Sequence, residues 1–111
     1  MYLLLMGSET VVDGVGGPED TDRWVAENDA RGTRTLGDRL APVGQAKTVR
    51  VRKGGTIVTD GPFAEAHEAI GGFDILICDS MDEALRITAD HPMARFGAIE
   101  VRPFYDWATP E

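Results

Sequence analysis

Short apolar runs, separated by glycine, proline and small polar residues, divide this chain into predicted strands and helices. Residues 2–6 form an apolar run of strand length that ends at Gly7-Ser8. Residues 47–52 alternate between polar and apolar side chains, and after the turn signal Lys53-Gly54-Gly55 the chain returns as a strand over 56–59. Further strands are predicted over residues 36–43, 73–78 and 98–102.

Two helices are marked by the residues at their ends. Pro18 and the acidic residues after it predict a helix over 18–31, because proline fits a first turn, acids favour its positive end and Gly32 stops it. Ser80 and Glu83 form a capping box, which predicts a second helix that His91-Pro92 terminates. One short helical turn is also predicted over 65–70.

The order of these elements predicts the fold class. Strand, helix, strand, hairpin, strand, helix, strand is the order of an α+β, ferredoxin-like split βαβ plait with an inserted β-hairpin. A length of 111 residues suits a single domain over 1–111. Both helices would then cover the same face of a mostly antiparallel sheet.

The other face of this sheet carries more apolar side chains than a face open to water usually does. Leu3, Leu4 and Leu5 are consecutive, so both sides of the first strand are apolar, and Phe73 and Ile75 share one side of a later strand. Since the pattern supplies no third helix, a second copy of the chain is the simplest cover. We therefore expect a homodimer, a dimeric α/β barrel whose sheets pack face to face.

The composition disfavours several classes of partner and cofactor. With 19 acidic and 11 basic residues the net charge is −8, which disfavours nucleic acid and anionic membrane surfaces as partners. The run 2–6 lacks a basic flank and a cleavage site, so we expect neither a signal peptide nor a membrane span, and a cytoplasmic protein. Cys78 lies in an apolar run and is expected to be a buried thiol. Gly14, Gly16 and Gly17 do not match a phosphate-binding loop, and no cofactor is predicted.

Residues 60–68 (DGPFAEAHE) concentrate the candidate chemistry. Asp60-Gly61-Pro62 predicts a stiff turn in which glycine supplies a positive φ. Asp60 is a candidate general base or ligand contact, and alternatively a turn carboxylate. Phe63 is either a plug that holds the loop down or a stacking surface for a ligand.

The acidic and imidazole groups of this segment also leave two interpretations open. Glu65, His67 and Glu68 are a candidate proton-transfer group or a solvated charged turn, and their spacing matches no standard metal site.

Outside this segment, Glu100 and Arg102 on the last strand are candidate ligand contacts if a partner encloses them, and otherwise a weak ion pair. His91 is expected to favour its charged form at a helix C-terminus.

Several of these segments together resemble the DGPF branch of the YciI-related family. The resemblance is carried by the first strand, residues 48–51 and 60–65, Gly71-Gly72-Phe73 and residues 97–103. It implies a dimeric, ferredoxin-like α+β barrel and, for some bacterial members, a link to sigma-factor or stress signalling. Some members of the wider group have a His–Asp pair in the cleft that the dimer encloses, but residues 18–34 of this chain contain no histidine that could supply it. Ala66-His67 also stands where Thr-Lys is usual in the branch.

Two classes of function follow from these observations. One is a dimer that binds or acts on a small molecule in a cleft near Asp60 and His67, with Phe63, Glu65, Glu100 and Arg102 contacting the ligand. The other is a non-catalytic regulatory or interaction module in which the same loop completes the dimer. The orientation of Asp60 and His67, toward a pocket or toward solvent, discriminates between them.

Overall fold

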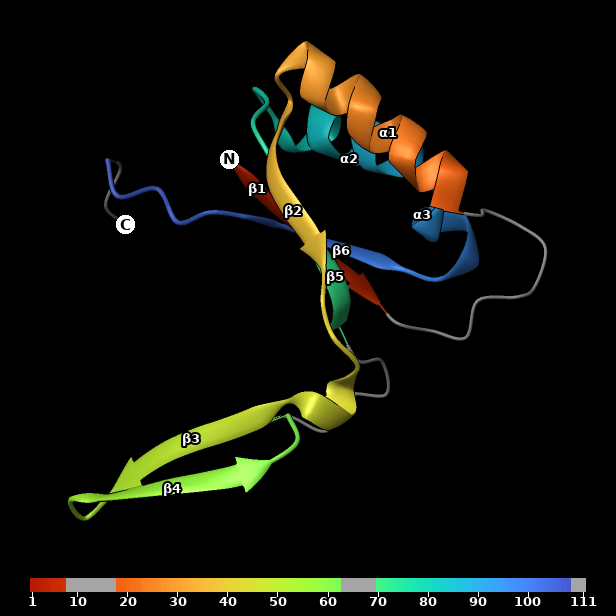
Figure 1. The fold of residues 1–111 in the computed structure, drawn as a ribbon. Coiled ribbons are helices and arrows are strands. Elements are labelled where there is room, and N and C mark those ends of the chain that lie inside the picture. The colour runs from red at the N-terminus through yellow and green to blue at the C-terminus, as the bar shows by residue number, and fades with distance from the viewer. Residues whose placement is uncertain (8–17, 63–69, 109–111) are drawn as a thin grey trace.

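A computed structural model describes residues 1–7, 18–62 and 70–108 of the chain. Its strands form a four-stranded sheet in the order β2-β5-β1-β6 and a separate pair, β3-β4 (Figure 1). The elements in chain order are β1 (Tyr2–Gly7), α1 (Pro18–Arg31), β2 (Arg34–Arg39), the 3-10 turn η1 (Val43–Gln45), β3 (Lys47–Arg52), β4 (Gly55–Asp60), β5 (Ile70–Leu76), α2 (Met81–Ala89), α3 (Met93–Phe96) and β6 (Ile99–Pro103).

Every pair of neighbouring strands in the four-stranded sheet is antiparallel. β1 lies in the middle, paired with β5 on one side and β6 on the other, and β2 pairs with the far side of β5. The helices lie together on one side of this sheet (Figure 1). The α+β class is therefore confirmed, and the strand order is compatible with a ferredoxin-like fold.

The helix ends follow the predicted capping residues. α1 ends at Arg31, and Gly32 has a φ of 74°, the left-handed conformation that glycine adopts easily. At the start of α2 the Ser80 hydroxyl accepts the Glu83 amide at 3.1 Å, while the Glu83 carboxylate accepts the amide of Asp79 at 3.1 Å. Beyond the predicted stop, Pro92 is the N-cap residue of the short helix α3, which the sequence pattern did not indicate.

Two predicted strands are displaced along the chain. The strand predicted over 36–43 is observed at Arg34–Arg39, and the one predicted over 73–78 at Ile70–Leu76. β2 begins earlier because Arg34 pairs with Leu76 of β5, and β5 begins earlier because Ile70 and Gly72 pair with Gly7 and Met6 of β1. The Leu40 amide adds a bond of 2.8 Å to the Gly71 carbonyl. The helical turn predicted over 65–70 lies outside the described residues except for Ile70, which belongs to β5.

A small core occupies the helix-covered face of the sheet. Its buried side chains are Leu4, Met6, Trp24, Leu76 and Ala84. Trp24 is the anchor of α1, because it is 3% exposed and its indole nitrogen donates to the Ile87 carbonyl of α2 at 3.0 Å. Burying an aromatic side chain with its polar group satisfied ties both long helices to one another.

The opposite face of the four-stranded sheet is called here the open sheet face. Side chains of paired residues share a face, so the strand registers place a continuous apolar stripe on it, flanked by acidic and basic side chains. The stripe consists of Leu3, Leu5, Leu36, Phe73 and Ile75, and the flanking residues are Asp38, Glu100 and Arg102. Four of the five apolar side chains are half-buried, and Leu36 is 55% exposed. None of the described helices lies over this face (Figure 1).

Gly37 of β2 provides a test of the packing between β2 and β5. A Cβ at this position would lie 2.6 Å from the Phe73 carbonyl oxygen and 2.7 Å from Cγ of Asp74. We expect Gly37→Ala to lower the free energy of unfolding by about 2–3 kcal/mol, measured by urea denaturation, because overpacking forces the strands apart. Gly44→Ala is the matched control, since a Cβ there meets nothing within 4 Å. An unchanged stability of Gly37→Ala would contradict the close approach.

Candidate functional site

Asp60 ends β4 at the base of the β3-β4 hairpin, and its carboxylate points outward. The side chain is 85% exposed and accepts a hydrogen bond of 2.5 Å from Nζ of Lys47. Beneath it the turn is closed by two bonds to Gly61, whose amide donates to the Ala46 carbonyl at 2.7 Å and whose carbonyl accepts the Thr48 hydroxyl at 2.7 Å. Gly61 has a φ of 94°, which confirms the predicted turn geometry.

A shallow hollow of about 500 Å³ lies beside this turn and is open to solvent. It is lined by residues 46–50 and Pro62, and Asp60 is not among the residues that line it. An exposed carboxylate paired with an exposed ammonium group fits the interpretation of Asp60 as a turn residue better than that of a general base.

The other loop candidates, Phe63, Glu65 and His67, lie outside the described residues. Their roles as stacking surface, ligand contact and catalytic group stay predictions. The chain that carries them connects Pro62, at the base of the hairpin, with Ile70, the first residue of β5.

Glu100 and Arg102 lie on β6, at one edge of the open sheet face. The Arg102 Nε and the Glu100 Oε2 are 3.7 Å apart, with both side chains more than half exposed. Their register partners on β1 are Leu5 and Leu3, so a charged pair borders the apolar stripe. In a single chain such an exposed pair contributes little to stability, which leaves both groups available to a ligand or a partner.

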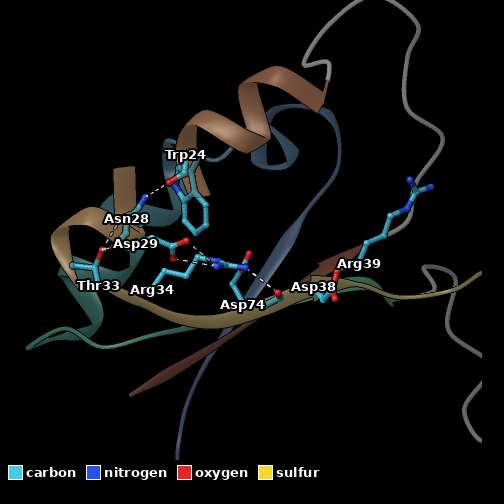
Figure 2. Close-up of polar contacts among 9 residues, drawn as sticks. Trp24, Asn28, Asp29, Thr33, Arg34, Asp38, Arg39 and Asp74 are labelled. Carbon is cyan, nitrogen blue, oxygen red and sulfur yellow. Dashed lines mark hydrogen bonds and ion pairs between the residues drawn. The ribbon is translucent and has the colours of Figure 1, made fainter. Parts of the chain in front are cut away.

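The most extensive polar cluster in the described part of the chain centres on Arg34 and Asp74 (Figure 2). Arg34 begins β2, and its Nε donates to Asp74 Oδ1 of β5 at 2.7 Å. Its two terminal nitrogens donate to Asp29 Oδ1 of α1 at 3.0 Å and to the Gly37 carbonyl at 2.8 Å. One guanidinium therefore joins a helix and two strands, as its fork of donors allows.

Neighbouring amide and hydroxyl groups extend this cluster along the end of α1. The Asn28 side chain donates to the Trp24 carbonyl at 2.9 Å and accepts the Thr33 hydroxyl at 2.8 Å (Figure 2). These bonds hold the α1–β2 connection in the position that brings Arg34 to Asp74.

Burial and the ion pair both shift the pKa values of Arg34 and Asp74. Burial raises the pKa of the Asp74 carboxyl, and the hydrogen bond from Arg34 opposes this only in part. Burial lowers the pKa of the Arg34 guanidinium, but its bonds to Asp74 and Asp29 raise it by more, so that it stays charged. Because Arg34 already has partners on all sides, the cluster acts as a structural brace of the helix-covered face.

The sequence carried one signal for this cluster that was missed. Asp74 lies between Phe73 and Ile75 in an apolar strand and shares a face with buried Leu76, a position where a carboxylate needs a cationic partner. Arg34 follows the C-terminal end of α1, and nothing in the neighbouring sequence identifies its partner, because that partner is 40 residues away in the chain.

His91 has a different environment from the one predicted. It is 3% exposed, its ring centroid lies 4.6 Å from that of Trp24, and its Nδ1 accepts the Met93 amide at 3.0 Å. Burial lowers the pKa of His91 to about 4. The expected charged histidine at a helix end is therefore wrong: an imidazole that is buried and accepts an amide stays neutral at neutral pH.

The Arg34 brace is tested by removing the guanidinium. We expect Arg34→Ala to lower the free energy of unfolding by about 3 kcal/mol, because it leaves the buried Asp74 carboxylate without a partner. Arg23→Ala is the matched control: Arg23 and Asp20 are 3.9 Å apart with both side chains at least half exposed, and its loss should cost less than about 0.5 kcal/mol. Equal urea denaturation curves for both variants would refute the brace.

The environment of His91 predicts a pH dependence of stability. Between pH 6.5 and about 4 the unfolded chain takes up a proton at His91 that the folded chain does not, so stability falls as the pH falls through this window. The full difference corresponds to about 3 kcal/mol. In His91→Asn, where the amide oxygen can replace Nδ1 as acceptor, this component should vanish. Parallel pH profiles of both proteins in urea denaturation would contradict it.

No helix in the described ranges is long and apolar enough to cross a bilayer.

Comparison with known proteins links the chain to a family. An uncharacterised protein of Rhizobium meliloti (strain 1021) is 39% identical to it over 100 residues, an alignment that covers 75% of this chain and 81% of the relative. The family model of the YCII-related domain matches residues 4–108. The chain therefore belongs to the YCII-related family.

Proposed function

We propose that this protein is a homodimer that binds a small molecule in a cleft between the open sheet faces of its two copies. The main observation in support of this proposal is the apolar stripe on that face, which no described helix covers. A partly exposed apolar stripe that no described helix covers is typical of an interaction surface. In this proposal the fold is a ferredoxin-like plait with the β3-β4 hairpin inserted, assembled into a dimeric α/β barrel.

A two-fold axis through the open sheet face would bury the same residues on both copies. Two sheets that pack face to face lie about 10 Å apart, and a stable interface of ordinary size buries about 1,600 Å² in total. The small core of the single chain supports this arrangement, because the helix-covered face alone buries only the five apolar side chains named above among the described residues.

The residues at the edge of the stripe suggest the chemistry of the ligand. Apolar side chains would contact most of its surface, and Arg102 and Glu100 would orient one polar or ionised group, as in most small-molecule sites. We include Phe63, Glu65 and His67 as contacts, since their segment leads directly into β5. A catalytic role of Asp60 and His67 forms the most specific version of this proposal.

The alternative is a non-catalytic regulatory or interaction module. The observation that favours it is the exposed Asp60–Lys47 pair above a closed turn, since such a pair supports a structural role for the base of the hairpin. In that case the loop completes the dimer, and the partner is a protein, in keeping with the resemblance to companions of sigma factors.

A thermal-shift screen of small molecules on the purified dimer tests the proposal. We expect at least one ligand to raise Tm by several degrees, since binding to the native state alone stabilises it by mass action. Arg102→Gln should lose most of this shift while it stays dimeric in light scattering. Arg95→Gln, an exposed arginine on α3, is the matched control and should keep it. A wild-type monomer at micromolar concentration, or a shift that Arg102→Gln retains in full, would refute the proposal.

A further inference from the structure

The β3-β4 hairpin, residues 47–60, projects from the molecule and is called here the arm. It extends at the end of the molecule away from the helices (Figure 1). Within it only Thr48 is buried and only Arg50 is half-buried; every other residue is exposed. The radius of gyration of 16.3 Å exceeds the roughly 13 Å of a compact chain of this length, consistent with an arm that extends from the rest.

One face of the arm is apolar. The register pairs Val49 with Val58 and Val51 with Thr56, so three valines share a side, and they are 62%, 57% and 60% exposed in the order 49, 58, 51. A hairpin of two strands is at best marginally stable in water by itself. Its turn is well formed, with φ of 53° at Lys53 and 78° at Gly54, yet the described part of the chain provides no cover for the valines.

The charge of the arm is opposite to that of the rest of the chain. Residues 47–60 contain four basic side chains and one acidic one, a net charge of +3, within a chain whose total is −8. The remainder therefore carries −11. A second copy of this chain offers a strongly acidic surface, whereas a nucleic acid would have to approach an acidic protein in order to reach the arm.

We propose that the arm is a dimer clasp: the arm of each copy packs its valine face against the body of the other copy. Arg50 and Arg52 lie on the opposite face of the arm, so the net positive charge of the arm favours its approach to the acidic body without direct ion pairs under the valines. This rests on the homodimer proposed above and adds a second contact region to it. The arm follows β2, an edge strand whose Leu36 belongs to the open sheet face, so clasp and sheet contacts would form one continuous interface. In a two-fold symmetric dimer each copy makes the same contact with the other, as this arrangement of two arms would do.

Sedimentation equilibrium of two variants on adjacent residues tests the clasp. Val58→Glu puts a charge on the valine face, and Thr59→Glu puts the same charge on the opposite face of the same strand. Both side chains are exposed in the single chain, so an arm free in solvent would tolerate either change. With the clasp, we expect the dimer Kd of Val58→Glu to rise at least ~100-fold and that of Thr59→Glu to change less than about 3-fold.

Val51→Glu repeats the test on the other strand, and circular dichroism establishes that each variant is folded. Dissociation of folded Val58→Glu and Val51→Glu into monomers, with Thr59→Glu dimeric, supports the clasp. If all three variants dimerise like the wild type, the clasp is refuted while the proposed sheet-face dimer stands. If the wild type is a monomer at micromolar concentration, both proposals fall. Binding of a duplex DNA probe that needs the arm, with dimerisation unaffected by Val58→Glu, would also overturn the clasp.

Discussion

A sheet with helices on only one of its faces is the constraint from which the other properties of this protein follow. The helices that the described part of the chain contains all lie on the same side, and the buried core gathers between them and β1 and β5. The strand register then sends a second set of aliphatic and aromatic side chains to the opposite side. Because the transfer of apolar surface out of water is favourable, a partner is expected to bind on that side.

Polar groups divide between the two faces according to what each face needs. On the covered face, Arg34 neutralises the Asp74 carboxylate and ties α1, β2 and β5 together, since a buried charge without a partner would be costly. On the open face, Glu100 and Arg102 stay exposed and weakly paired at the edge of the apolar stripe. The first pair serves the fold of the single chain, whereas the second is available for recognition.

Much of the fold was predictable from local sequence signals. Pro18, Gly32 and the Ser80–Glu83 capping box marked helix ends, and Gly61 marked a turn with positive φ, because these preferences act within a few residues. The strand limits of β2 and β5 were wrong, since they depend on pairing between segments far apart in the chain. Of the predicted site residues, Asp60 is exposed and paired with Lys47, and Glu100 and Arg102 lie close together on β6. The roles of all three, and those of Phe63, Glu65 and His67, stay predictions.

The sequence by itself determined the succession of helices and strands, the family and the apolar character of both sheet faces, since periodicity and turn chemistry are local properties of the chain. Only the tertiary structure decided which charged residues are buried and paired. The Arg34–Asp74 pair joins residues 40 positions apart, and the neutral state of His91 results from its burial against Trp24, 67 positions away. Such contacts arise when distant segments pack, and burial then sets the energy of a charge.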